Sequence, residues 1–195
     1  MKLTELTVAQ LLAAFRSSEP TPGGGSAAAL AGAIGASLLA MVAALPKARA
    51  ETDADRTRLR DAGQRCAALS DDLAVLVDRD SEAYDTVMAA YRRPKATEEE
   101  KAARSAAIQA ALRTAIDAPL DVMRACAAAI EQSPVVAALG NASASSDVQV
   151  GRELLGAGLR GAKLNVDINL ESVKDAQYVN GVRDEVSMLI RSTRM

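Results

Sequence analysis

The sequence contains no histidine and very few aromatic residues: its 195 residues include three tyrosines, one phenylalanine and no tryptophan. Without histidine, every mechanism that depends on an imidazole base is excluded, and acid–base chemistry must come from Asp, Glu, Lys, Tyr or Cys. A nucleic-acid-binding protein usually carries a basic excess and stacking aromatic side chains. The net charge of −2 and the 2% aromatic content therefore argue against that class.

Cysteine is also scarce. Cys66 and Cys126 both lie within apolar helical patterns, which predicts reduced thiols in the core of a cytoplasmic protein. A zinc site would have to combine these two cysteines with carboxylates, an uncommon ligand set, so we expect no metal site. The first residues show no apolar region of a signal peptide.

The composition favours helices over sheets. Hydrophobic residues make up 49% of the chain, and much of that share is alanine rather than β-branched or aromatic residues. No linker interrupts the sequence, so we predict one all-α domain over residues 1–195, a bundle of long antiparallel helices. The expected helices cover residues 7–18, 26–44, 53–91, 97–118, 147–169 and a final segment from about 175. Between them, Pro119 is expected to kink or restart a helix, and a short helical piece is expected at 134–139.

The stretch from Pro20 to Ser26, Pro-Thr-Pro-Gly-Gly-Gly-Ser, precedes a long uncharged helix. We expect the three glycines to adopt backbone angles closed to other residues and to let a ligand approach, with Ser26 as the N-cap. Unpaired N–H groups at a helix start favour a ligand with negative or polar oxygens. The plainer interpretation is a tight turn that only starts a buried helix. The helix is long enough to span a membrane, but its Ala and Gly content without an aromatic belt argues against a membrane partner.

The longest periodic segment carries an acidic residue where an apolar one is expected. Leu69, Leu73, Leu76, Asp80 and Tyr84 follow one another at steps of three and four, which describes one buried face of a helix. Burial would raise the pKa of Asp80 and suit it to act as a general acid near neutral pH. The alternative is a carboxylate satisfied by a buried cation or by a helix end. Asp71, Asp72 and Asp78 fall off this face and are expected on a solvated surface.

Other polar residues stand out with plainer explanations beside them. Lys95 lies in a loop and Asp147 at a helix start, where each is ordinarily a solvated or dipole-stabilising charge. Asn165 and Asn169 are four residues apart, hence on one helix face, where they could simply bridge backbone groups.

Five ordered blocks of the sequence resemble the cyclodeaminase/cyclohydrolase family, which includes the C-terminal half of formiminotransferase-cyclodeaminase. The resemblance covers nearly the whole chain. The blocks are Pro20–Ser26 with its Ala-rich helix, Asp78–Tyr84, Pro94-Lys95-Ala-Thr-Glu-Glu, Gly140-Asn141 with Ser146-Asp147, and Leu164-Asn-Val-Asp-Ile-Asn169.

This resemblance implies an all-helical homodimer that acts on one-carbon adducts of tetrahydrofolate without a metal or redox cofactor. The implied reaction is either cyclodeamination of formiminotetrahydrofolate or interconversion of 5,10-methenyltetrahydrofolate and 10-formyltetrahydrofolate. Asp80 matches the family's proton donor, while Lys95 and Asp147 would position or relay charge. The implied substrate-binding residues are Gly23, Gly24, Gly25, Ser26, Tyr84, Asn141, Ser146, Asn165 and Asn169. Lys47, Arg49 and Arg92 are candidates for binding the glutamate tail of the substrate.

Two departures from the family pattern are visible. Leu45-Pro-Lys-Ala-Arg49 replaces a Thr-x-Gly-basic block, and Arg93 stands where Leu usually precedes Pro-Lys. Two other functions therefore remain open: a divergent protein that binds a folate-like ligand without turnover, and a purely structural helical dimer.

Overall fold

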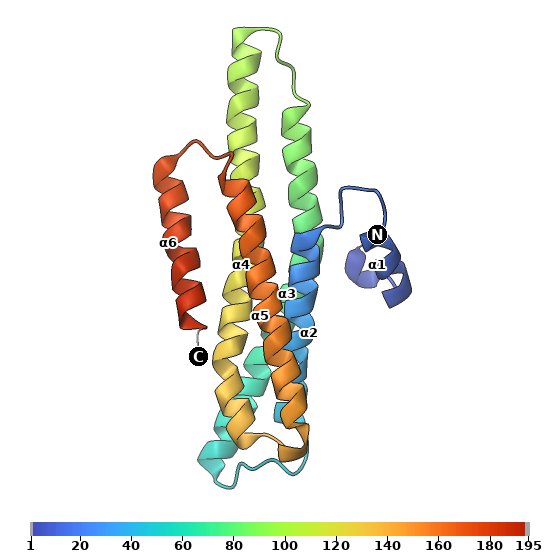
Figure 1. The fold of residues 1–195 in the computed structure, drawn as a ribbon, viewed down its shortest axis with the longest axis vertical. Coiled ribbons are helices and arrows are strands. Elements are labelled where there is room, and N and C mark those ends of the chain that lie inside the picture. The colour runs from blue at the N-terminus through green and yellow to red at the C-terminus, as the bar shows by residue number, and fades with distance from the viewer. Residues whose placement is uncertain (1, 194–195) are drawn as a thin grey trace.

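The protein is an elongated bundle of four long helices, flanked by two shorter ones, in a computed structural model that describes residues 2–193 (Figure 1). In that range the regular structure is helical, apart from an isolated bridge between Ala48 and Asn141. The order is η1 (Leu3–Glu5), α1 (Val8–Phe15), α2 (Gly24–Ala44), α3 (Asp53–Tyr91), α4 (Glu98–Leu139), η2 (Ala142–Ala144), α5 (Ser145–Leu170) and α6 (Ala176–Ser192). The predicted all-α fold is confirmed.

Several predicted helix ends are confirmed by their caps. Thr7 with Gln10 and Thr97 with Glu100 form capping boxes. The third helix begins and ends where its periodicity indicated, and the Asp175 side chain caps α6 by accepting bonds from the backbone N–H groups of Gln177 and Tyr178.

α2 packs very closely against α5 because small residues let the two helices approach each other. A Cβ added to Gly35 would lie 2.6 Å from the Gly151 carbonyl oxygen of α5, and one added to Gly158 would lie 2.8 Å from the Ala28 carbonyl oxygen. These separations are too short for any side chain, so the two backbones are nearly in contact. Gly151 and Gly158 of α5 therefore serve close packing against α2.

α2 and α4 are the two described helices that are long and apolar enough to cross a membrane by length and composition. About half of each apolar window is buried inside the bundle, 44% in α2 and 50% in α4. Core helices pass the same test, so this property is weak evidence for a membrane span.

α4 runs without interruption through both of its prolines, so the expected restart at Pro119 and the separate helix at 134–139 are wrong. Each proline lacks the N–H that would bond to the carbonyl four residues before it. At Pro119 the freed carbonyl is that of Ala115, and it accepts a 2.9 Å bond from the Asn169 side-chain amide of α5. At Pro134 the freed carbonyl of Ile130 accepts a 2.7 Å bond from the Ser133 hydroxyl. Side chains thus replace both missing backbone bonds.

This replacement predicts a measurable coupling between Asn169 and Pro119. We expect Asn169→Ala to lower the free energy of unfolding by about 1–3 kcal/mol, because it leaves the Ala115 carbonyl without its partner. In a Pro119→Ala background the restored backbone N–H supplies that bond, so the same substitution should cost at least about 1 kcal/mol less. Urea unfolding of the four proteins in this cycle measures the coupling.

Asn180→Ala, on the exposed side of α6, is the matched control and should change stability little in either background. If Asn169→Ala lowered the free energy of unfolding equally in the wild-type and Pro119→Ala backgrounds, the Asn169 side chain would not be replacing the backbone bond that Pro119 lacks.

Candidate functional site

Asp80 and the first turn of α2 form the centre of the candidate site. Asp80 Oδ2 accepts a 2.9 Å bond from the backbone N–H of Ser26 and a 3.3 Å bond from the Ser26 hydroxyl. Ser26 is fully buried, and its hydroxyl lies 3.3 Å from that of Ser81. An acceptor for an N–H in the first helical turn normally comes from the N-cap side chain, but here it comes from α3.

The glycine turn differs from the prediction that its glycines adopt special backbone angles and that Ser26 is the N-cap. Gly23, not Ser26, is the N-cap, and none of the described glycines has a positive φ. What requires glycine is the approach of Asp80: a Cβ on Gly25 would lie 1.9 Å from Asp80 Oδ1. Any side chain at this position would push the carboxyl away from the helix end.

Burial raises the pKa of the Asp80 carboxyl above its ordinary value, and the bonds from the Ser26 backbone N–H and hydroxyl offset part of that rise. The prediction of a raised pKa is confirmed. The alternative of a carboxylate held by a helix end also describes the observed contact. Both hold because the Ser26 bonds satisfy the carboxylate but offset only part of the effect of burial on its pKa.

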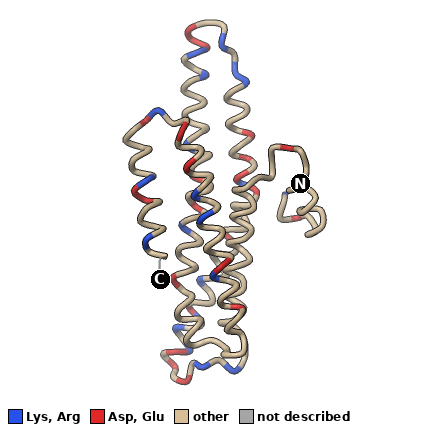
Figure 2. Tube along the Cα trace, viewed as in Figure 1, with Lys and Arg blue, Asp and Glu red and all other residues tan. Residues whose placement is uncertain are grey.

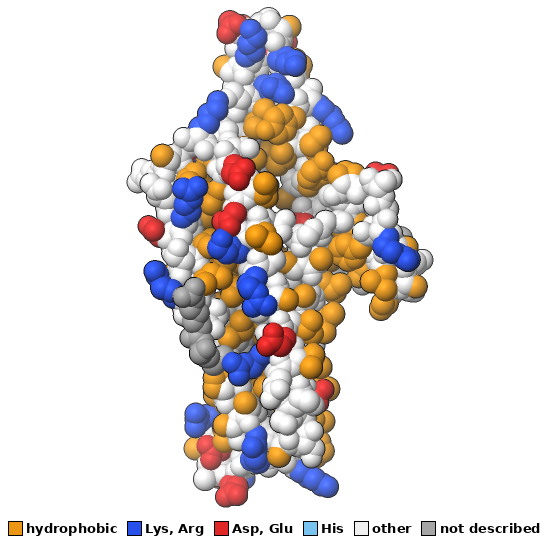
Figure 3. Space-filling view, in the orientation of Figure 1, with side chains coloured by type: hydrophobic (Ala, Val, Ile, Leu, Met, Phe, Trp, Pro, Cys, Tyr) orange, Lys and Arg blue, Asp and Glu red, His pale blue; other side chains and the backbone are white. Residues whose placement is uncertain are grey.

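Two other predicted residues lie near this centre. A Cβ on Gly24 would lie 3.6 Å from the Asn165 side-chain nitrogen, so α5 brings Asn165 against the glycine turn. That nitrogen also donates a 3.0 Å bond to the Gly161 carbonyl within its own helix. Tyr84 lies one turn beyond Asp80 on α3 and is partly exposed. Figure 3 shows the surface hollowed between the upper end of the bundle and the N-terminal segment.

Asn169 lies one turn further along α5, where its amide nitrogen is bound to α4 as described above. Its amide is therefore committed to the backbone of α4, which is the plainer role considered for it.

Three predicted residues, Asn141, Ser146 and Asp147, lie at the other end of α2. Asn141 contacts the segment after α2, because its side chain donates a 2.6 Å bond to the Pro46 carbonyl and accepts one from the Ser143 N–H. α2 has 21 residues and is about 30 Å long. Within one chain these residues are a helix length away from Asp80.

Lys95 is also away from Asp80, in a polar pocket beyond the C-terminal end of α3. Tyr91 lies about 16 Å along the helix from Asp80, at 1.5 Å per residue. The pocket there has a volume of about 560 Å³, and four of its lining side chains are cations: Lys95, Lys101, Arg104 and Lys174. None of the described residues that line it is acidic.

Contacts with the backbone organise this cation pocket. Arg104 donates two bonds to the Tyr91 carbonyl and lies 5.6 Å from the centre of the Tyr91 ring. Gln109 bonds to the Ser172 carbonyl and the Lys174 N–H, which fixes the loop between α5 and α6. Sequence reasoning missed Lys174 because the cations come from segments separated by more than 60 residues.

Other sequence predictions need correction. Asp78 is not on a solvated face: it is half-buried and accepts bonds from the Leu3 N–H and the Thr4 hydroxyl. Arg49, a candidate for the substrate tail, donates instead to the carbonyls of Ala137 and Gly140. Sequence reasoning also missed Ser81, although it adjoins Asp80.

The model of the formiminotransferase-cyclodeaminase family matches residues 7–188 of this chain. The chain belongs to this family. It is 41% identical over 187 residues to a methenyltetrahydrofolate cyclohydrolase of Methylorubrum extorquens, a match that covers 94% of this chain and 88% of the relative. It is 34% identical over 178 residues to the formimidoyltransferase-cyclodeaminase of Sus scrofa, covering 91% of this chain but only 33% of that longer relative.

A solved structure supports the same relationship. The crystal structure of formiminotetrahydrofolate cyclodeaminase from Thermotoga maritima superposes with a TM-score of 0.81 at 26% identity, covering 98% of this chain and 92% of the other. The family predicted from the five sequence blocks is confirmed.

Burial of Asp80 predicts a pH-dependent effect of its removal. Because its pKa is higher in the folded than in the unfolded state, stability from the protonated carboxyl is fully present below the unfolded pKa. That stability is lost as the pH rises through the folded pKa. We therefore expect Asp80→Asn to raise the melting temperature at pH 8, with a difference that shrinks as the pH falls. Thermal melts of both proteins from pH 8 down to acid pH measure this difference in melting temperature.

Asp72→Asn, an exposed position on the same helix, removes the same charge and should show no such trend. A stabilisation by Asp80→Asn that grows towards acid pH would contradict the assigned burial effect.

Proposed function

We propose that this protein is a folate one-carbon enzyme whose reaction is the hydrolysis of 5,10-methenyltetrahydrofolate to 10-formyltetrahydrofolate, and its reverse. The observation that carries the proposal is the half-buried carboxyl of Asp80, whose pKa is raised by burial and which bonds to the N-terminal end of α2. The choice of reaction is supported by the 41% identity to a cyclohydrolase of similar length. Cyclodeamination is the second candidate, supported by the likeness to the Thermotoga maritima enzyme.

Asp80 is the proposed proton donor. Water adds to the methenyl carbon and loses a proton, the bond from that carbon to N5 breaks, and N5 takes up a proton from Asp80. No oxidation state changes, so the proposed reaction needs no redox cofactor, and its proton transfers are ones that a carboxyl can carry out. In the alternative reaction, the same carboxyl would protonate the departing ammonia.

The surroundings of Asp80 would hold the pterin. The Ser26 N–H is used by Asp80, but the N–H groups of Gly24 and Gly25 in the same first turn of α2 have no acceptors within the helix and can donate to the polar atoms of the pterin. Asn165 and Tyr84 flank this place from α5 and α3. Carboxylates at the opposite end of the folate would bind the cation pocket, since Lys95, Lys101, Arg104 and Lys174 line it with positive charge and, among the described residues, only Lys101 of these four forms an ion pair, with Glu98. In this proposal Lys95 binds the tail and does not relay protons at Asp80.

The enzyme is proposed to be a homodimer in the cytoplasm, where the buried free thiols of Cys66 and Cys126 stay reduced. An antiparallel arrangement of the two α2 helices would bring Asn141, Ser146 and Asp147 of one copy towards Asp80 of the other. This arrangement would explain why residues matching one family pattern lie at opposite ends of α2 within one chain.

The proton-donor role predicts that Asp80→Asn lowers kcat by about 100-fold or more, the usual contribution of a general acid. Affinity for the folate should remain, because the amide oxygen can still accept the Ser26 N–H. Absorbance assays with methenyltetrahydrofolate and formiminotetrahydrofolate, run separately, measure turnover, and calorimetry measures binding.

Asp72→Asn is the matched control and should keep wild-type turnover. Wild-type protein that binds a folate but turns over neither adduct would favour the binding-module alternative. Protein whose melting temperature no folate raises would favour the structural one.

The cation pocket predicts a separate effect on substrate binding. We expect Lys174→Ala to raise KM several-fold with little change in kcat, because the tail is bound equally in the ground and transition states. The effect should diminish at high salt. Arg183→Ala, an exposed cation of α6, is the control. A fall in kcat at unchanged KM would contradict tail binding at this pocket.

A further inference from the structure

The N-terminal helix α1 lies away from its own bundle (Figure 1). None of its residues 8–15, all within the described part of the chain, is buried; Val8 is 75% and Leu12 56% exposed. Val8, Leu11, Leu12 and Phe15 form one apolar stripe at steps of three and four. An isolated helix of eight residues is not stable in water, so its order requires a surface that covers this stripe.

Both ends of the segment are attached, which places the stripe at a definite position. Before α1, Leu3 packs against the main core, and Leu3 and Thr4 bond to Asp78 of α3. After α1, the chain passes through Pro20 and Pro22 directly into α2. α1 is therefore held beside the N-terminal end of α2 and projects from it.

An uncovered apolar face adjoins this position. On α5 it consists of residues at alternating steps of four and three, namely Val150, Leu154, Ala157, Gly161, Leu164 and Ile168. On α2 it consists of Ala27, Ala31, Ile34, Leu38 and Met41. Ile34, Leu164 and Ile168 are 46%, 69% and 61% exposed. Exposed contiguous apolar surface marks an interface, and this spacing is that of helices packing on helices.

The figures show the same face. α2 carries no charge along its length in Figure 2, and Figure 3 shows hydrophobic side chains along the line of α2 and α5 and again on the projecting segment. A second copy of this chain offers a face of equal length and composition, as a twofold contact requires.

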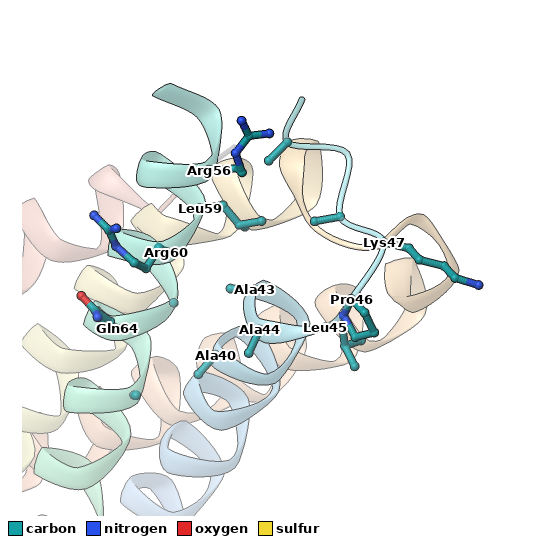
Figure 4. Close-up of a pocket in the computed structure, with 14 residues that line it drawn as sticks. Ala40, Ala43, Ala44, Leu45, Pro46, Lys47, Arg56, Leu59, Arg60 and Gln64 are labelled. Carbon is teal, nitrogen blue, oxygen red and sulfur yellow. The ribbon is translucent and has the colours of Figure 1, made fainter. Parts of the chain in front are cut away.

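An apolar groove of about 640 Å³ lies at the opposite end of α2 (Figure 4). Ala40, Ala44 and Leu45 line it from α2 and the residue that follows, and Leu59, Gly63 and Ala67 line it from α3. Gly63 lets α3 approach α2 closely beside the groove, because a Cβ there would lie only 2.7 Å from the Ala43 Cβ. Like α1, the groove lies on the α3 side of α2.

We infer that α1 of each copy inserts its apolar stripe into this groove of a second copy, so that the dimer is clamped by two exchanged arms. A twofold axis that crosses the α2 helices at right angles lays the two apolar faces on each other with the helices antiparallel. The same axis brings the C-terminal end of one α2 beside the N-terminal end of the other, where α1 is attached. The clamp rests on the proposed homodimer but not on the proposed reaction.

Engineered cysteines test the contact, because the only native cysteines, Cys66 and Cys126, are buried. Differently tagged copies carrying Leu12→Cys and Ala67→Cys are co-expressed, purified as a mixed dimer and oxidised. We expect a disulfide-linked species of twice the chain mass on a non-reducing gel. Each variant alone should not form it, nor should Leu12→Cys with Val75→Cys, an exposed control position on α3.

Light scattering of the wild-type protein and a second variant complete the test. Leu12→Asp should raise the dimer dissociation constant at least 10-fold with the circular dichroism of the bundle unchanged, whereas Val75→Asp should leave it unaltered. A monomeric wild-type protein, or a dimer in which Leu12→Cys and Ala67→Cys do not link, would overturn the clamp. Linked dimers without folate turnover would overturn only the proposed reaction.

Discussion

The hydrogen bond from the Ser26 backbone N–H to the Asp80 carboxylate joins the start of α2 to the middle of α3, and the candidate site is built around it. It is possible only because Gly25 has no side chain in the path of the carboxyl. The bond has two consequences. It gives the first turn of α2 an acceptor from another helix, and it holds in place a half-buried carboxyl whose pKa is raised by burial.

The same kind of exchange between helices recurs elsewhere in the bundle. Asn169 of α5 supplies α4 with the bond that Pro119 cannot make, and Asp78 of α3 holds the N-terminal segment. In each case a polar side chain satisfies a backbone group on a different element. Such contacts fix the position of one helix along the length of its neighbour. The glycines of α2 and α5 determine how closely these two helices pack.

The position of α2 also shapes the proposed function. Its N-terminal end meets Asp80, its C-terminal end meets Asn141 through Pro46, and its outer face is apolar and uncovered. One helix therefore contributes to the candidate site and to the surface proposed for a second copy. α2 is uncharged and strongly apolar, which suits it to both contacts: one side packs in the bundle and the other is available to a partner.

Sequence periodicity alone determined the helical class, the bounds of α3 and the inward-facing position of Asp80, because each depends on residues within a few turns. The tertiary structure decided the rest. It showed that α4 continues through Pro119, that Gly25 serves close approach rather than a special φ, and that Lys95 lies with Lys174 instead of Asp80. These outcomes depend on side chains from distant segments, such as Asn169 and Asp80, which supply bonds that local sequence cannot reveal.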